Sequence, residues 1–252
     1  MFLLALRPLA LLAALAACSG DLVGGGEGPD GAGPGPGPGP GGPDGAAGQV
    51  DAGALPCSAE PAHEGEATYY DATGSGNCSF DPIPGDLLVA ALNTTDYAGA
   101  EACGACLAVD GPDGTVTVRV VDRCPGCSAG DVDLSTEAFG EIASLSAGRV
   151  AITWRFVACD VTGSVVYHFQ GGNAIQPRNH RYAVATLEAR PAGGAFSEVS
   201  RELYNYFVAG SLGGGAVDLR LTDVHGHVLE DLGVEPEADA NVASAAQFPA
   251  CP

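Results

Sequence analysis

From Gly33 to Pro40 the chain alternates glycine with proline. Proline fixes its φ angle and lacks a backbone donor, and glycine has no side chain for a core to bury. Such a segment is a poor helix or strand, so residues 19–56 predict a solvated tether, read either as a stalk or as a leader without a role. Folding is therefore expected over residues 57–252, enough for one large or two small domains.

Residues 1–18 have the form of an export signal. Arg7 precedes an apolar run from Leu9 to Ala17, which is shorter than the roughly 20 residues of a membrane-spanning helix. Leu15-Ala16-Ala17-Cys18 has the form of a bacterial lipobox, in which Cys18 becomes lipidated. We expect an exported outer-membrane or cell-surface lipoprotein, attached to a membrane only through that lipid, with a plain secretory signal as the alternative.

Eight cysteines remain after Cys18, and an even number in an exported chain predicts four disulfides. Zinc is the alternative, because Cys103-x-x-Cys106 and Cys124-x-x-Cys127 have the spacing of a four-thiolate site. Export disfavours free thiolates, and His225-x-His227 lacks a third ligand. We therefore expect no metal and no cofactor.

The chain carries a net charge of −21 and contains no lysine. From Cys57 onward, 26 acidic residues face nine arginines. Such a surface repels nucleic acids and anionic polymers, so we exclude DNA and RNA as partners.

Strict alternation of apolar and polar residues predicts strands at 115–121 and 150–156. Between them a helix is expected, with Ser135 as N-cap, Gly148 as its stop and an apolar stripe. The stripe comprises Ala138, Phe139, Ile142 and Leu145.

After Cys159 the chain reads as all-β, with a domain boundary near Asp160. Strands are expected at 165–169, 182–188, 206–208 and 216–222, with a turn near 225–227. Short strands at this spacing predict a sandwich.

Two aspartates are the candidate chemical groups. Asp122 is expected at a strand end, and Asp133 two residues before the helix cap, where the helix dipole would favour its ionised form. A general acid would instead need a raised pKa, from burial or from a like-charged neighbour such as Asp122. Two solvated turn residues are the alternative interpretation.

These aspartates belong to a wider set of motifs. The set comprises Val120-Val121-Asp122-Arg123-Cys124-Pro125, Gly130-Asp131-Val132-Asp133-Leu134-Ser135, His63-Glu64-Gly65-Glu66-Ala67-Thr68-Tyr69, Asp81-Pro82-Ile83-Pro84, Ala174-Ile175-Gln176-Pro177-Arg178-Asn179-His180 and Gln247-Phe248-Pro249. With them, the chain from His63 to about Pro249 resembles the bacterial expansins, which loosen cell walls without cutting polysaccharide. The resemblance implies a mainly β protein, with a six-stranded double-psi β-barrel over residues 57–160. An immunoglobulin-like, carbohydrate-binding β-sandwich would follow over residues 161–252.

The resemblance also implies roles for individual residues. Asp133 would be the groove acid on which activity depends most, corresponding to the acid of family-45 glycoside hydrolases, whose catalytic base expansins lack. Asp122 and Thr68 would bind the glycan beside it. Tyr204 would remain from an aromatic platform in the second domain, with a core or edge-strand tyrosine as the alternative interpretation.

The cysteines are similar to those of plant-type expansins, in Cys103-Gly104-Ala105-Cys106 and in Trp154-Arg155-Phe156-Val157-Ala158-Cys159. That similarity implies the pairs Cys78–Cys103 and Cys106–Cys159. The remaining cysteines would then pair as Cys124–Cys127 and Cys57–Cys251.

The chain departs from the family pattern twice. Cys124 stands where bacterial expansins usually carry a groove tyrosine, and the stretch Gln170-Gly171-Gly172-Asn173-Ala174 lacks the pair of tryptophans expected there. Fewer aromatic faces for sugar rings predict weaker binding to crystalline cellulose.

We therefore expect an expansin-like monomer that loosens cell-wall polysaccharide (cellulose, hemicellulose or peptidoglycan) without hydrolysis. One alternative is a glycan-cleaving enzyme, like family-45 endoglucanases or lytic transglycosylases, with a second carboxylate among Asp71, Asp81 and Asp96. The other is a pure carbohydrate-binding module.

Overall fold

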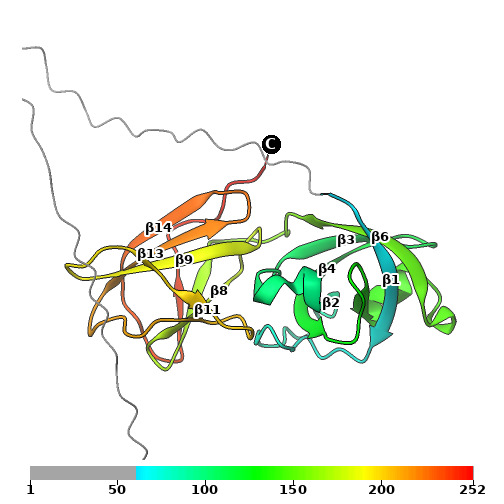
Figure 1. Cartoon of the computed structure of the whole chain (residues 1–252), viewed down its shortest axis with the longest axis horizontal. Helices are drawn as coiled ribbons and strands as arrows, with labels where there is room; N and C mark the ends of the chain where they lie inside the picture. Colours follow the sequence, from blue (N-terminus) through cyan, green and yellow to red (C-terminus); the bar gives the residue numbers. More distant parts are fainter. Residues whose placement is uncertain (1–60, 252) are drawn as a thin grey trace, which may run out of the picture. The chain divides into compact units, whose positions relative to one another are not determined.

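The computed structural model describes residues 61–251 (Figure 1). The signal peptide (1–18) with its Cys18, the tether (19–56) and Cys57 lie outside the described residues, so predictions about them remain predictions. In the described part, no helix is long and apolar enough to cross a membrane.

Six strands close into a barrel in the order β1-β5-β2-β4-β3-β6. They are β1 (His63–Tyr70), β2 (Val89–Asn93), β3 (Cys106–Asp110), β4 (Thr115–Cys124), β5 (Val132–Ser135) and β6 (Val150–Val157). The β1/β5 and β2/β4 pairs are parallel, and the other neighbours are antiparallel. Strand β5 thus lies between β1 and β2, although nearly 40 residues separate it from β2 in the sequence.

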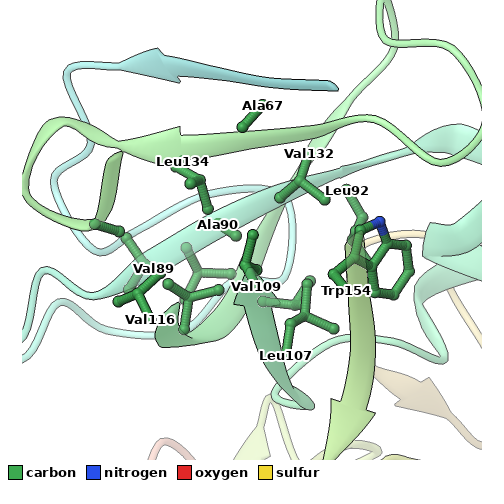
Figure 2. Close-up of a cluster of buried hydrophobic side chains, with 14 of the residues drawn as sticks. Ala67, Val89, Ala90, Leu92, Leu107, Val109, Val116, Val132, Leu134 and Trp154 are labelled. Atoms are coloured by element: carbon green, nitrogen blue, oxygen red, sulfur yellow. The ribbon is translucent and has the colours of Figure 1, made fainter. Parts of the chain in front are cut away.

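The barrel is filled by the inward-facing residues of its strands (Figure 2). Val116, Val118 and Val120 are buried, as their alternation predicted. Val121 is buried as well, because the pairing of β4 with β2 shifts register at this point. Trp154 fills the barrel near β5, and its indole N–H donates to the Gly130 carbonyl at 2.7 Å.

Helix α2 (Thr136–Ile142) begins where predicted and ends earlier. The Ser135 side chain accepts a hydrogen bond from the Ala138 backbone N–H, which confirms the N-cap. Leu145 lies beyond the helix in the 3₁₀ turn η2 (Leu145–Ala147) and is 41% exposed, so its place in the apolar stripe was wrong. Gly148 ends that turn rather than α2. Two short helices, α1 (Thr94–Tyr97) and η1 (Ala98–Ala100), follow β2.

The remaining strands form two sheets around a second core, the β-sandwich. The four-stranded sheet has the order β10-β9-β13-β14, and the five-stranded sheet β11-β12-β8-β7-β15. Their bounds are β7 (Val166–Gln170), β8 (Ala174–Arg178), β9 (Val184–Pro191), β10 (Ser197–Glu198), β11 (Ser200–Arg201), β12 (Phe207–Val208), β13 (Val217–Asp223), β14 (Val228–Val234) and β15 (Asn241–Ala243). The four strands expected from the sequence are present within a few residues of their predicted bounds.

Strand β8 was not expected from residue patterns, because it carries Gln176 and Pro177 at buried positions. Gln176 is fully buried, and its side-chain amide donates to the Cys78 carbonyl at 2.9 Å. The buried amide of Gln176 therefore has its hydrogen-bond partner outside the sheet, on Cys78. The residue pattern around Gln176 cannot predict a partner so distant in the sequence.

Three disulfides agree with the expected pairs: Cys78–Cys103, Cys106–Cys159 and Cys124–Cys127. The four cysteines of the zinc alternative, Cys103, Cys106, Cys124 and Cys127, all take part in these disulfides. Cys251 is disulfide-bonded, but its predicted partner Cys57 lies outside the described residues. The proposed domain boundary at residue 160 falls between β6 and β7 and stays a prediction.

Candidate functional site

The strand register places three predicted site residues in one row across the barrel. Thr68 pairs with Asp133, Asp133 with Ala91, and Ala91 with Asp122, on the adjacent strands β1, β5, β2 and β4. We call these four residues the groove row. Register partners point to the same side of a sheet, and their neighbours Ala67, Val132, Leu134 and Ala90 are all buried in the barrel core. The groove row therefore faces outward.

Ala91 separates the two carboxylates of the groove row. Strands lie about 4.8 Å apart, so the backbones of Asp133 and Asp122 are roughly 10 Å from each other. Asp122 lies within β4, two residues before the strand ends rather than at the end expected from the sequence. Asp133 lies within β5, two residues before the helix cap Ser135 as expected, so neither aspartate is a turn residue. The two carboxylates thus lie on either side of Ala91, a small residue that is itself 3% exposed.

Asp133 is half-buried and accepts a hydrogen bond from the Thr68 hydroxyl at 2.6 Å. Burial raises its pKa above the ordinary value, Thr68 and Arg149 oppose that rise, and the charge of Asp122 adds to it. The expectation that the helix start favours the ionised form was therefore wrong, since desolvation outweighs the stabilising partners. The negative charge of Asp122 raises the pKa of Asp133, as expected for the like-charged neighbour of a general acid.

Asp122 is held by backbone donors. Its Oδ1 accepts from the N–H of Asn77 at 2.6 Å and from its own neighbour Arg123 at 2.8 Å. Gly76 makes this approach possible, because a Cβ there would lie 2.4 Å from the Asp122 Cβ. These contacts fix the carboxylate in place before any ligand arrives.

Tyr70 is a site residue that the sequence reasoning missed. It lies two residues after Thr68 on β1, and hence on the same face. Its hydroxyl is buried and has no hydrogen-bond partner within residues 61–251. Burial, with the charges of Asp122 and Asp133, raises its pKa, so the hydroxyl stays protonated and remains a donor. Its i, i+2 spacing from Thr68 was the signal that could have identified it.

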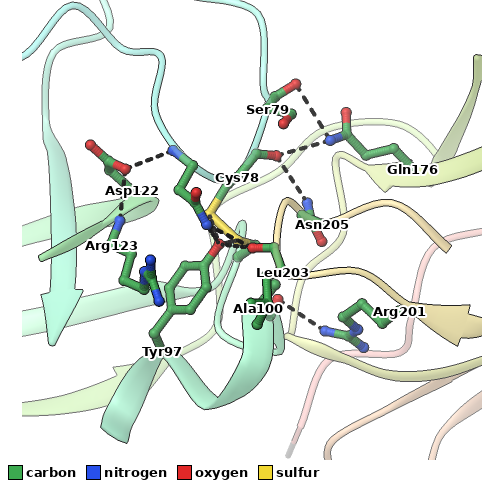
Figure 3. The surroundings of a disulfide bond; sticks show 12 residues. Cys78, Ser79, Tyr97, Ala100, Asp122, Arg123, Gln176, Arg201, Leu203 and Asn205 are labelled. Carbon is green, nitrogen blue, oxygen red and sulfur yellow. Dashed lines mark hydrogen bonds between the residues drawn. A yellow bond between two sulfur atoms is a disulfide. The ribbon is translucent and has the colours of Figure 1, made fainter. Parts of the chain in front are cut away.

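Asn77 connects the groove row with the loop that carries Tyr204, through its bonds to Asp122 and Leu203, which Figure 3 labels. Its backbone N–H binds Asp122, while its side-chain amide donates to the Leu203 carbonyl at 2.6 Å and to the Tyr97 hydroxyl at 2.9 Å. The Tyr97 hydroxyl donates in turn to the same Leu203 carbonyl at 2.9 Å. The residue after Leu203 is Tyr204, which is 45% exposed. Asn77 also was not identified from the sequence.

Further contacts attach the sandwich to the barrel around the buried Cys78–Cys103 disulfide. The Cys78 carbonyl accepts from the side-chain amides of Gln176 at 2.9 Å and of Asn205 at 3.3 Å (Figure 3). Arg201 donates to the Ala100 carbonyl at 3.0 Å and to the sandwich carbonyl of Ala185 at 2.9 Å. Side chains of the sandwich thus bind the backbone of the barrel.

Among residues 61–251, Tyr204 has no coplanar aromatic neighbour. Its ring lies 6.0 Å from Tyr206 at 45°, and Tyr206 lies 6.2 Å from His168 at 65°. Tyr206 is itself buried. The stretch Gln170–Ala174 forms the turn between β7 and β8, with Gly171 and Gly172 at positive φ. The turn between β7 and β8 thus contributes no aromatic side chain beside Tyr204, and the role of Tyr204 in binding sugar stays a prediction.

The other candidate residues are engaged elsewhere. His227 binds the buried Asp223 through Nδ1 at 2.8 Å. Among residues 61–251 no cluster of histidine, cysteine or acidic side chains could hold a metal ion. Asp81 pairs with Arg178. Asn93 caps α1 by accepting from the Asp96 backbone N–H, and the Asp96 carboxylate accepts from the Asn93 side-chain amide and from the Gly130 N–H.

Comparisons with known proteins bear directly on this site. A sequence family described as lytic transglycolase matches residues 89–154, which hold the middle of the barrel. Expansin-YoaJ of Bacillus subtilis is 38% identical over 179 residues, which cover 67% of this chain and 77% of that protein.

Two solved structures share both the fold and the sequence similarity. The apo expansin of Clavibacter michiganensis has a TM-score of 0.69 at 30% identity, over 75% of this chain and 99% of that one. An aspartate-to-asparagine variant of the same protein was solved in complex with cellohexaose. It has a TM-score of 0.69 at 29% identity, over 75% of this chain and 99% of that one. The expected double-psi barrel followed by a second β domain is confirmed. The chain belongs to the expansin family.

Proposed function

We propose that this protein loosens cell-wall polysaccharide without cleaving it, by binding a glycan chain along the groove row. The observation that carries the proposal is the groove row itself, two carboxylates and a hydroxyl in register on the outer face of an expansin barrel. The similar Clavibacter variant was solved with cellohexaose, a neutral β-glucan fragment. We assign the same class of ligand to this chain.

Asp133 is the main groove acid in this proposal. Because burial raises its pKa above the ordinary value, the protonated form of the carboxyl group, which can donate as well as accept a hydrogen bond, persists to higher pH than in an exposed aspartate. Hydrogen bonds to charged groups contribute about 1.5–3 kcal/mol, more than a neutral pair between two sugar hydroxyls. Asp133 can therefore replace an interchain hydrogen bond of the wall, while Asp122 and Thr68 hold the released chain.

Loosening differs from hydrolysis in what the site must provide. Hydrolysis needs a general acid and a second carboxylate that activates water or attacks the sugar. Here the second carboxylate, Asp122, is bound by two backbone N–H donors and acts as a glycan acceptor. No cofactor takes part.

The disulfides and the N-terminal segment indicate where in the cell the protein acts. Three described disulfides indicate an oxidising compartment, so the protein is exported. Cys18 carries the lipid, residues 19–56 form the stalk, and the barrel and sandwich divide near residue 160. The protein acts as a monomer on cellulose, hemicellulose or peptidoglycan, and its acidity favours neutral glycans.

The test combines a mechanical and a chemical measurement on the same wall samples. Purified protein should weaken cellulose–xyloglucan and peptidoglycan sheets under load while releasing no soluble sugar. Asp133→Asn should abolish the weakening with an unchanged circular dichroism spectrum, because asparagine keeps the shape but cannot ionise. Sugar release that disappears in the variant would instead make the protein an enzyme. Weakening retained by the variant would remove Asp133 from its role.

A further inference from the structure

The three described disulfides differ in exposure. Cys78, Cys103, Cys106 and Cys159 are all buried, with at most 8% of any of them exposed. Cys124 and Cys127 are partly exposed, and Pro125 and Gly126 between them are exposed. A Cβ on Gly126 would meet no atom within 4 Å. Thiol–disulfide exchange requires that a thiolate reach a sulfur, so Cys124–Cys127 is the accessible bridge of these three.

Opening the Cys124–Cys127 bridge would leave its loop largely in place. The cysteines are three residues apart, so the bridge restricts the unfolded chain far less than the other two, which span 25 and 53 residues. Cys124 stays in the ladder of β4 opposite Asn93. The Asp131 carboxylate accepts from the N–H of Ser128 at 3.1 Å and of Glu66 at 2.9 Å, which holds the far end of the loop.

The bridge lies next to the groove row. Cys124 follows Asp122 by two residues on β4, beyond the register shift, so both side chains lie on the same face of the strand. If a glycan lies along the groove row, which is the proposed function, it passes over Asp122 and covers the adjacent bridge. A bound glycan then hinders the reaction of a thiol with the bridge, and a thiol attached at the bridge weakens glycan binding in turn.

The surrounding charges select the class of thiol. Asp122 and Asp131 flank the bridge along the chain, and Asp96 binds the adjoining Gly130 N–H at 2.9 Å. Arg123 is the neighbouring cation, with its Nε buried. Three carboxylates against one guanidinium, within a strongly acidic chain, repel an anionic thiol and favour a neutral or cationic one.

We propose that Cys124–Cys127 is a covalent modification site, where small neutral or cationic thiols undergo thiol–disulfide exchange that a bound glycan blocks. The attacking thiolate forms a new S–S bond with one cysteine sulfur, and the Cys124–Cys127 bond breaks. The released cysteine thiolate takes a proton from water. A second thiol molecule then displaces the first as a small-molecule disulfide and leaves two protein thiols.

The experiment uses the native full chain with cysteamine, 2-mercaptoethanol and glutathione, each at the same thiolate concentration. Mixed disulfides and alkylated thiols are mapped to individual cysteines by mass spectrometry over time. Cys124 and Cys127 should react at least tenfold faster than the buried Cys78, Cys103, Cys106 and Cys159. The rate should fall from cysteamine to 2-mercaptoethanol to glutathione, and the difference should shrink in 0.5 M salt.

A double variant, Cys124→Ser with Cys127→Ser, is the matched control and should lose the fast labelling entirely. Equal labelling of all described cysteines, or fast labelling retained in this variant, would overturn the exchange site. Adding cellohexaose at saturation, with binding followed by calorimetry, should slow the exchange tenfold.

The cellohexaose arm separates this inference from the proposed function. Cellohexaose that binds without protecting the bridge would overturn the blocking of exchange and leave wall loosening intact. Cellohexaose that does not bind, with fast selective exchange retained, would support the exchange site and count against the proposed glycan groove.

Discussion

At the residue scale, the chemistry of Asp133 depends on a balance between burial and one short hydrogen bond. Burial favours the protonated acid, and the Thr68 hydroxyl, donating at 2.6 Å, favours the carboxylate. The pKa of Asp133 is higher in the folded chain than in the unfolded chain. The folded state therefore loses stability as the pH rises from below the unfolded-state pKa to above the folded-state pKa, because Asp133 must then ionise where it is partly buried. Thr68 limits that cost, and its contribution is present only where Asp133 is ionised.

Replacing Thr68 with valine should therefore raise the pKa of Asp133 further. The loss of stability should be about 1 kcal/mol at pH 7 and should vanish near pH 3, where Asp133 is protonated in both folded and unfolded chains. Carbon-detected NMR titration of the Asp133 carboxyl would measure its pKa. Thermal unfolding at pH 7 and at pH 3 would measure the stability. Thr68→Ser, which keeps the hydroxyl, should restore both. An unchanged pKa in Thr68→Val would show that the hydroxyl does not control Asp133.

At the element scale, the groove row is a product of strand register. Alternation in the sequence predicted the strands around Val116 and Val150, and the family resemblance indicated Thr68, Asp122 and Asp133 as site residues. Neither the alternation nor local propensity predicts that β5 inserts between β1 and β2. The β1/β5 pairing joins residues that are 65 positions apart in the sequence, such as Thr68 and Asp133. The raised pKa of Asp133 and the role of Tyr70 follow from that insertion. They could not be predicted from the sequence because burial is a property of the assembled barrel.

Gly76 tests the element that positions Asp122. An alanine there would place its Cβ 2.4 Å from the Asp122 Cβ and 2.7 Å from the Val121 carbonyl oxygen, so the segment from Gly76 to Cys78 must move. Gly76→Ala should cost about 1–3 kcal/mol of folding stability and weaken cellohexaose binding, because the Asn77 N–H leaves Asp122.

The control for this substitution is Gly140→Ala. Gly140 is exposed in α2, and a Cβ there meets no atom within 4 Å. The helix should gain about 0.5–1 kcal/mol from alanine, with unchanged binding. Normal cellohexaose affinity in Gly76→Ala would contradict the assignment of Asp122 to the glycan.

At the scale of the whole molecule, the proposed glycan site combines side chains from two hydrophobic cores. The groove row belongs to the barrel, and Tyr204 belongs to a loop between β11 and β12 of the sandwich. Asn77 joins them, since its backbone binds Asp122 and its side chain binds the Leu203 carbonyl. A ligand that contacts both parts gains affinity when they are already held in register, because binding then need not order them.

Asn77→Ala should therefore weaken cellohexaose binding about two- to tenfold, as expected for loss of hydrogen bonds worth roughly 0.5–1.5 kcal/mol. Asn173→Ala is the matched control, because the Asn173 amide makes a similar bond to the Ala209 carbonyl at 2.9 Å within the sandwich alone. Both variants should lose similar stability in thermal unfolding, and only Asn77→Ala should lose affinity in calorimetry. In a Tyr204→Ala background, Asn77→Ala should have little further effect, since the residue it positions is gone. Equal losses of affinity in the two asparagine variants would mean that stability, and not the connection between barrel and sandwich, governs glycan binding.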